Sequence, residues 1–220
     1  MKLFHVPHTC VNITFCIVGE YDNNVYLIDD GSHAILVDPS CCCDALMDMI
    51  GGRTLDGIIL THHHWDHRGA AAELRKRTNA PTFASRADAP FIEEKRHDPT
   101  DSKRLPACKV DTFLGDGHVL NFGAMAWRVI ETPGHTPGSL CLFLDSCYGC
   151  YPQKAPVLIS GDTLFYHACG RTDFYGGNPD QMKRSLQQLS TLPPNTCVLP
   201  GHGEQTTIAA EQRFAFRMFE

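Results

Sequence analysis

The chain has 220 residues, of which 43% are hydrophobic, and its formal net charge is −6. A chain of this length can bury roughly two-thirds to three-quarters of the surface that its unfolded form exposes, so we expect one full core and a single domain over residues 1–220. The acidic charge, and the lack of any long run of Lys or Arg in the sequence, argue against nucleic acid as a partner.

The N-terminal segment 1–20 mixes polar residues such as His5, His8 and Asn12 with apolar ones, so it does not resemble a signal peptide. No stretch approaches the roughly 20 apolar residues that span a bilayer. Eleven cysteines, including three adjacent ones at 41–43, form a high and odd count, which gives little support to a disulfide framework. We therefore predict a soluble cytoplasmic protein with mostly reduced cysteines and no membrane partner, and the sequence leaves its oligomeric state open.

Short apolar runs rich in β-branched residues, bounded by Gly, Pro, Asp or Asn, recur along the chain and predict strands. The runs 24–28 and 34–37 flank Asp29-Asp30-Gly31-Ser32, which predicts a hairpin because Asp-Gly tolerates the positive φ of a tight turn. The other predicted strands are 57–61, 119–120, 125–130, 140–144, 157–160 and 196–199.

Helical patterns lie between these strands, at 69–77, 88–96, 179–189 and 207–218. Asn178 is placed as an N-cap, with Pro179 at the first helical position. Helices and strands interleave, while hairpins join several strand pairs, so the sheets should be mixed. We predict an α/β fold in which two mixed β-sheets pack together and helices flank them.

One segment, Thr61-His62-His63-His64-Trp65-Asp66-His67, packs four histidines and an aspartate into six positions at the end of an apolar run. Clustered imidazoles repel one another when protonated, whereas neutral imidazoles and a carboxylate are good ligands for zinc, iron or manganese. If His62 and His64 continue the strand, their spacing places both on one face and turns His63 away. An exposed polar loop would be the simpler interpretation if this motif stood alone.

Three further apolar runs also end in a Gly that is followed at once by a ligand-type residue: Gly134-His135, Gly161-Asp162 and Gly201-His202. Loops at the carboxyl ends of strands line the ligand crevice of α/β proteins, so these loops can converge with the histidine-rich motif. The predicted metal ligands are His62, His64, Asp66, His67, His135, Asp162 and His202.

These motifs, H-x-H-x-D-H followed by the three Gly-preceded residues, resemble the metallo-β-lactamase superfamily. The resemblance implies an αββα sandwich with the site at one edge. It assigns one metal to His62, His64 and His135, a second to Asp66, His67 and His202, and makes Asp162 a bridge. It also implies that Asp38 supports the ligands from behind, although a plain turn aspartate explains that residue as well.

Two divalent ions, zinc in the first place and iron or manganese as alternatives, would share a water and depress its pKa from about 16 toward 7. The resulting hydroxide is the expected nucleophile, and the ions also stabilise the oxyanion, so no Ser or Cys nucleophile is needed. Asp66 and Asp162 are the expected catalytic carboxylates, and Asp66 can in addition guide a proton as the intermediate collapses.

Within the superfamily, the segments 61–67, 161–165 and 200–203 resemble the glyoxalase II group, the hydroxyacylglutathione hydrolases. That resemblance implies cleavage of a small-molecule thioester such as S-D-lactoylglutathione into a hydroxy acid and a free thiol. The pattern is that of compact glyoxalase II-like proteins without the C-terminal helical domain, which share Gly-Arg-Thr-Asp-Phe at 170–174. Arg171, Asp173 and Phe174 are the candidate substrate contacts, although an Arg171–Asp173 pair that only braces the loop explains them equally well.

The segment 169–174 also resembles persulfide dioxygenases, which hold one iron and oxidise glutathione persulfide with O₂. The metal count separates the two-metal thioesterase from the one-iron persulfide dioxygenase. A hydrolase of another ester or a lactone, a ribonuclease-type relative and a non-catalytic binding module are further alternatives. Cys147 and Cys150 form a single C-x-x-C, which supplies only two of the four ligands of a structural zinc, so a polar loop is the favoured interpretation there.

Overall fold

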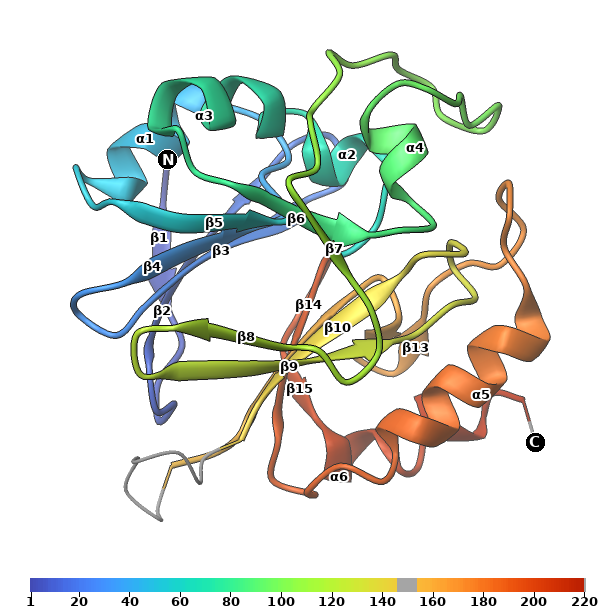
Figure 1. Ribbon diagram of the computed structural model, residues 1–220. Coiled ribbons are helices and arrows are strands. Elements are labelled where there is room, and N and C mark those ends of the chain that lie inside the picture. Colours follow the sequence, from blue (N-terminus) through green and yellow to red (C-terminus); the bar gives the residue numbers. More distant parts are fainter. Residues whose placement is uncertain (146–153, 220) are drawn as a thin grey trace.

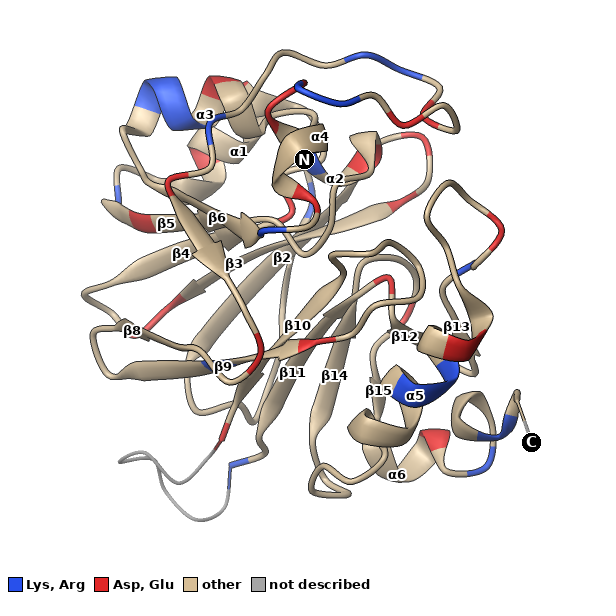
Figure 2. Ribbon diagram, turned by 45° about the vertical axis from the view of Figure 1, so that its right-hand side comes forward, with Lys and Arg blue, Asp and Glu red and all other residues tan. Residues whose placement is uncertain are grey.

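The structure is a computed structural model that describes residues 1–145 and 154–219. Two β-sheets pack face to face, and helices cover the outer side of each sheet (Figure 1). This arrangement confirms the predicted sandwich of two mixed sheets flanked by helices. Most Lys and Arg residues lie on the outer helices and loops, interspersed with Asp and Glu (Figure 2).

The first sheet has seven strands in the order β1-β2-β3-β4-β5-β6-β7. Neighbouring strands from β1 through β4 pair antiparallel, and neighbouring strands from β4 through β7 pair parallel. The strands are β1 Leu3–His5, β2 Asn12–Val18, β3 Asn23–Asp29, β4 Ala34–Val37, β5 Leu55–Ile59, β6 Thr82–Ser85 and β7 Thr112–Leu114. Its helices are α1 Cys43–Ile50, α2 Trp65–Arg68, α3 Ala71–Thr78 and α4 Ala89–Ile92.

The second sheet has six strands in the order β15-β14-β11-β10-β9-β8, with β11 and β14 parallel. The strands are β8 Val119–Phe122, β9 Met125–Glu131, β10 Leu140–Leu144, β11 Val157–Gly161, β14 Cys197–Pro200 and β15 Thr206–Thr207. A separate ribbon pairs β12 Leu164–Phe165 with β13 Ala168–Cys169, and the helices are α5 Pro179–Leu189, α6 Ile208–Glu211 and a 3₁₀ turn at Ala215–Arg217. Over the described part of the chain, none of the helices has both the length and the apolar character needed to cross a membrane.

The central strands of both sheets are buried on both faces, which is why they appear in the sequence as continuous apolar runs. In β4, Ile35 and Val37 pack between the sheets with Trp127 of β9, while Leu36 packs beneath the helices α1 and α3. Helix α5 covers the outer face of the second sheet with Met182 and its apolar neighbours. The sheets are therefore held rigidly by two faces of packing, and the loops at their ends carry the polar residues.

Several predicted elements are confirmed. The hairpin between β3 and β4 turns at Gly31, whose φ is +95°. Helix α5 has the predicted bounds, and the side-chain oxygen of Asn178 accepts a hydrogen bond from Gln181 N at 2.9 Å.

Other predicted elements are wrong in extent. The helix predicted over 88–96 ends at Ile92, because Glu94 adopts a left-handed φ of +54°. The helix predicted over 207–218 is broken after Glu211, whose buried carboxylate accepts hydrogen bonds from Thr206 Oγ1 and from His167 N at 3.0 Å. Cys147 and Cys150 lie outside the described residues.

Candidate metal centre

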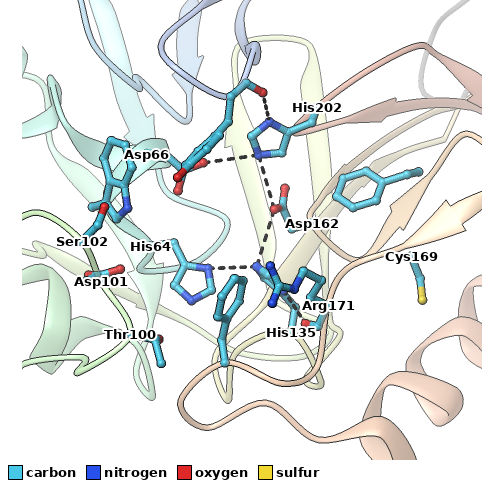
Figure 3. Close-up of a pocket in the computed structure, with 14 residues that line it drawn as sticks. His64, Asp66, Thr100, Asp101, Ser102, His135, Asp162, Cys169, Arg171 and His202 are labelled. Carbon is cyan, nitrogen blue, oxygen red and sulfur yellow. Dashed lines mark hydrogen bonds and ion pairs between the residues drawn. The ribbon is translucent and has the colours of Figure 1, made fainter.

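All seven predicted ligands meet at one edge of the sandwich. Figure 3 shows those that line the cavity there: His64, Asp66, His135, Asp162 and His202. The loop after β5 carries His62 and His64, and helix α2 carries Asp66 and His67. His135 follows β9, Asp162 follows β11 and His202 follows β14. The strand β5 ends at Ile59, so His62 and His64 lie in a loop and not on a continued strand as predicted, yet their rings still face the same site.

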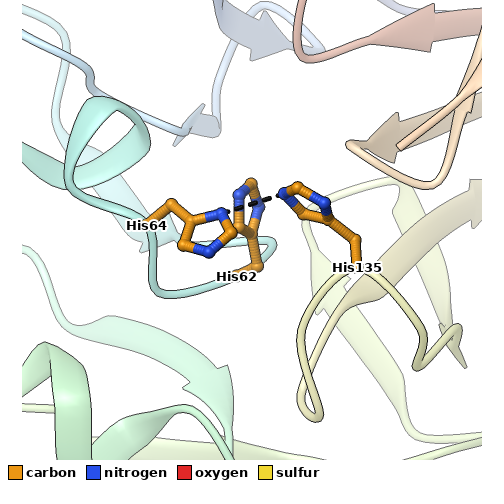
Figure 4. A group of neighbouring side chains, drawn as sticks. All are labelled: His62, His64 and His135. Atoms are coloured by element: carbon orange, nitrogen blue, oxygen red, sulfur yellow. Dashed lines mark hydrogen bonds between the residues drawn. The ribbon is translucent and has the colours of Figure 1, made fainter. Parts of the chain in front are cut away.

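The first ligand group consists of His62, His64 and His135 (Figure 4). One nitrogen from each ring lies within 4.8 Å of the other two, and His64 Nδ1 is 2.9 Å from His135 Nε2. All three residues are buried. Three converging imidazole nitrogens are a common ligand set for a zinc or iron ion.

The second ligand group consists of Asp66, His67 and His202. His67 Nε2 lies 3.1 Å from His202 Nε2, and Asp66 Oδ2 lies 3.4 Å from the same His202 atom. Asp162 lies between the two groups. Its Oδ2 is 3.5 Å from both His135 Nε2 and His202 Nε2, and its Oδ1 is 3.3 Å from His67 Nε2. This is the position that a bridging carboxylate requires.

Some of the atoms that could ligate a metal have no hydrogen-bond partner in the site. Within the described part of the chain, His62 Nε2 and Asp162 Oδ1 are buried and have no hydrogen-bond partner. A buried polar atom without a partner costs about 1–3 kcal/mol, so a site that gathers several such atoms is destabilised unless a ligand binds them. Nitrogen and carboxylate oxygen donors at this spacing suit zinc, iron and manganese alike.

Four of the five ligand histidines are held through a hydrogen bond to their other ring nitrogen, as is usual at metal sites. His62 Nδ1 is 3.1 Å from Thr61 Oγ1, and His67 Nδ1 is 3.0 Å from Asp38 Oδ2. Asp38 also accepts hydrogen bonds from Thr61 N at 2.8 Å and Thr61 Oγ1 at 2.6 Å. Asp38 therefore fixes the start of the histidine motif and directs Nε2 of His67 into the centre.

Backbone carbonyls hold the two ligand histidines that come from the second sheet. His135 Nδ1 donates to Arg171 O at 2.7 Å, and His202 Nδ1 donates to Tyr21 O at 2.7 Å. In both rings the nitrogen that remains for a metal is Nε2. The carbonyl of Arg171 thus helps to build the centre whatever its side chain does.

A charged cluster behind the centre was not found from the sequence. His63, fully buried, lies between Asp88 Oδ2 at 3.0 Å and Asp98 Oδ2 at 2.9 Å. Burial alone would lower the pKa of His63, but the hydrogen bonds to these two carboxylates raise it to about 9. Asp98 Oδ2 also lies 3.7 Å from His64 Nε2, the nitrogen opposite the one that faces His135. The cluster supports the first ligand group as Asp38 supports the second.

The two ligand groups have different electrostatics in the metal-free chain. Burial and neighbouring histidines lower the pKa of His62 well below its usual value and that of His64 to about 3. Burial also disfavours the charged forms of His67 and His202, but Asp162 and Asp66 outweigh it: they raise the pKa of His67 well above its usual value and that of His202 to about 9.

A cavity of about 530 Å³ opens onto both ligand groups. Its walls include four aromatic side chains, Tyr21, Trp65, Phe165 and Phe174. Arg171 lines the cavity beside Phe174, and its guanidinium lies 4.3 Å from the centre of that ring.

Asp173, the third predicted substrate contact, does not line this cavity. Its carboxylate pairs with the Arg171 side chain at 2.9 and 2.7 Å. The structure therefore brings Arg171 and Phe174 to the site and gives Asp173 the bracing position.

Comparison with known proteins identifies the family. Residues 18–202 match the model of the metallo-beta-lactamase superfamily. The chain belongs to this superfamily. It is 33% identical over 202 residues to the probable metallo-hydrolase YqgX of Bacillus subtilis, which covers 89% of this chain and 92% of that protein.

Two relatives carry the glyoxalase II name. The chain is 30% identical over 213 residues to the hydroxyacylglutathione hydrolase GloC of Haemophilus influenzae, covering 92% of this chain and 96% of that protein. It is 37% identical over 184 residues to the hydroxyacylglutathione hydrolase of Acidiphilium cryptum, covering 82% of this chain but only 64% of that longer protein. The superfamily member is thus glyoxalase II-like and compact.

Solved structures agree with this placement. The BLEG-1 B3 metallo-beta-lactamase superposes with a TM-score of 0.80 at 28% identity over 100% of both chains. TTHA1623 in a di-iron-bound form superposes with a TM-score of 0.76 at 31% identity, covering 91% of this chain and 97% of that one. ETHE1 from Myxococcus xanthus superposes with a TM-score of 0.73 at 29% identity, covering 92% of this chain and 82% of that one. The chain is therefore a member of the metallo-beta-lactamase superfamily with His and Asp groups that can hold metal ions.

Proposed function

We propose that the protein is a binuclear metallohydrolase that cleaves a small-molecule thioester, such as S-D-lactoylglutathione, into a hydroxy acid and a free thiol. The observation that carries the proposal is the pair of ligand groups joined by Asp162. The relatives named hydroxyacylglutathione hydrolase support the thioester as the substrate class.

Two divalent ions in these groups would supply a hydroxide nucleophile at neutral pH and a Lewis acid for the thioester carbonyl. Asp162 sets the separation of the two ligand groups. Asp66 lines the cavity, and Asn23 Nδ2 donates to its Oδ2 at 2.9 Å, which fixes the carboxylate beside the ligands. Asp66 therefore faces the cavity as a carboxylate that can accept a proton, as expected for a group that guides a proton to the leaving thiolate.

The cavity walls fit a substrate with an apolar stem and an acidic end. The aromatic side chains, Phe174 among them, exclude water from the reacting bond, which strengthens the electrostatic stabilisation of an oxyanion. Arg171 places a positive charge at the cavity wall, and a carboxylate of a glutathione-type thiol can pair with it.

The test is elemental analysis of the purified protein together with an S-D-lactoylglutathione hydrolysis assay. We expect two ions per chain, release of one thiol per substrate, and loss of turnover after treatment with a chelator. Protein that holds two ions and does not cleave thioesters would overturn the proposed substrate class, and turnover by metal-free protein would overturn the mechanism.

A second candidate is a mononuclear iron dioxygenase that acts on glutathione persulfide. The segment 169–174 and the structural similarity to ETHE1 favour it. One iron per chain and oxygen uptake that depends on persulfide would establish this function. Cleavage of other esters or lactones by the two-metal protein would instead keep the hydrolase mechanism and change only the substrate.

A further inference from the structure

Two of the three adjacent cysteines form a close pair outside the metal centre. Cys41 Sγ and Cys42 Sγ lie 3.2 Å apart where the chain enters helix α1. Cys42 is exposed and Cys41 is partly exposed, so reagents in solution reach the pair. The next residue, Cys43, points elsewhere, and its Sγ lies 3.6 Å from Arg77 Nη1.

The backbone explains why adjacent side chains meet. Neighbouring residues in an extended chain point to opposite sides. Cys42 instead adopts a left-handed conformation, with φ 62° and ψ 49°, which residues other than Gly rarely adopt. The conformation is held from both sides, because Leu46 N donates to Cys42 O at 3.0 Å and Ala70 N donates to Pro39 O at 2.9 Å. The two thiols are thus kept together before any ligand arrives.

We propose that Cys41 and Cys42 form a bidentate binding site for trivalent arsenicals and similar thiophilic species. Two sulfurs on one tetrahedral ion at about 2.3 Å lie roughly 3.8 Å apart, and the narrower angles of a three-coordinate pyramidal centre shorten that separation toward the 3.2 Å seen here. Among the described residues, no third side chain joins the pair in a group whose donor atoms all lie within 4.8 Å of one another. The site therefore offers two sulfur ligands, which suits a three-coordinate arsenic that already carries one organic substituent.

The raised pKa of Cys41 favours the same class of ligand. Burial and the contact with Cys42 raise the pKa of the Cys41 thiol to about 11, so this thiol is protonated at neutral pH. Zinc requires thiolates. Phenylarsine oxide, the probe chosen here, reacts with two neutral thiols: two S–H bonds and the arsenic–oxygen bond break, two arsenic–sulfur bonds form, and one water leaves without any change in oxidation state.

The experiment measures the phenylarsine oxide adduct on the reduced full-length protein by intact-mass spectrometry. A background with Cys147→Ser and Cys150→Ser removes the other closely spaced pair in the sequence. We expect one adduct per chain, and its affinity should fall about 10²-fold or more in Cys41→Ser and in Cys42→Ser, because the second thiol no longer binds intramolecularly.

Cys43→Ser is the matched control from the same triplet, and it should keep the adduct at unchanged affinity. Circular dichroism verifies that each variant is folded, so that loss of binding reports on the thiols. Retention of the adduct in either Cys41→Ser or Cys42→Ser, or equal loss in Cys43→Ser, would overturn the proposal. The inference does not depend on the proposed function.

Discussion

The two ligand groups of the metal centre lie side by side but differ in charge and exposure. The side chains of His64 and His135 in the first group are 10% and 4% exposed, whereas His202 in the second group is 22% exposed. In the metal-free chain His62 and His64 of the first group are neutral imidazoles, because their pKa values are lowered, while His67 and His202 of the second group are imidazolium ions beside carboxylates. The first group is therefore ready for a cation, while the second must release protons before it can bind one.

The difference follows from where the carboxylates lie. Asp66 and Asp162 are next to His67 and His202, so protons compete with a metal ion for the same nitrogen atoms. Burial is the main cause that keeps His62 neutral, and the neighbouring histidines lower its pKa further. The first ligand group thus binds protons weakly, whereas the second group must exchange protons for a metal ion. Each of the following changes tests one of these two groups or the difference between them.

The largest effect is expected from Asp162→Ala, because this residue contacts both groups. Loss of the bridge should lower turnover by about 10³-fold or more and reduce the metal content toward one ion per chain, while the chain stays folded. Thiol release and elemental analysis measure the two results. His64→Ala should abolish turnover as well, through the first group. Near-normal activity in either variant would contradict the two-group centre.

A smaller effect is expected from Asp98→Asn, which acts on the first group alone. Replacing the carboxylate 3.7 Å from His64 Nε2 removes the negative charge behind this ring, and changes of residues that support metal ligands typically weaken metal affinity about 10–100-fold. Competition with a chelator measures the affinity of each ion separately. Asp44→Asn is the control, because that side chain is 93% exposed. Equal weakening of both ions would show that Asp98 stabilises the fold and not one ligand group.

The pH dependence of metal binding should separate the groups without any mutation. A pKa of about 9 for His202, and a raised pKa for His67, mean that both are protonated at pH 7 in the metal-free chain. Binding there displaces up to two protons, so its affinity should fall by up to about 100-fold for each pH unit of acidification below 9. In the first group the pKa of His62 is lowered and that of His64 is lowered to about 3, so these two ligands release no protons on binding between pH 6 and 8, and the affinity there should depend less on pH than in the second group.

Zinc titrations of the metal-free protein at several pH values, in buffers of different ionisation enthalpy, measure the protons released by each ion. The first ion should release almost none and the second should release up to two. Identical proton release for both ions would remove the distinction between the groups.

The ligands were predictable because each follows an apolar strand, and in three cases a Gly marks the turn that brings it to the edge of the sheet. The supporting residues were not. Asp88 and Asp98 come 25 and 35 residues after His63, at the start of the helix predicted over 88–96 and just beyond its end, and only the folded chain brings them to that ring. The strands β1 and β7, three residues each, were too short for alternation to show.

The same limit applies to the helices. The apolar pattern of 207–218 predicted one continuous helix, but the buried carboxylate of Glu211 collects hydrogen bonds from Thr206 and His167, which come from other elements. A tertiary contact of this kind overrides local helix propensity, and the local sequence pattern of a segment does not reveal it. Helix α1 was missed for a related reason, since its start depends on the left-handed backbone of Cys42.

The smallest effect is expected from Arg171→Met, which leaves both ligand groups intact because the backbone carbonyl of residue 171 still accepts from His135 Nδ1. Removing the charge at the cavity wall should raise KM for S-D-lactoylglutathione about 5–10-fold with little change in kcat, as expected for a contact made equally in the ground and transition states. Asp173→Asn is the matched control: it breaks the exposed pair with Arg171, which contributes little to the stability of the fold because solvent screens it, and frees the guanidinium for substrate. If the pair only braces the loop, both variants should change melting temperature and KM alike. If Arg171 binds a substrate carboxylate, KM should rise in the first variant and stay level or fall in the second.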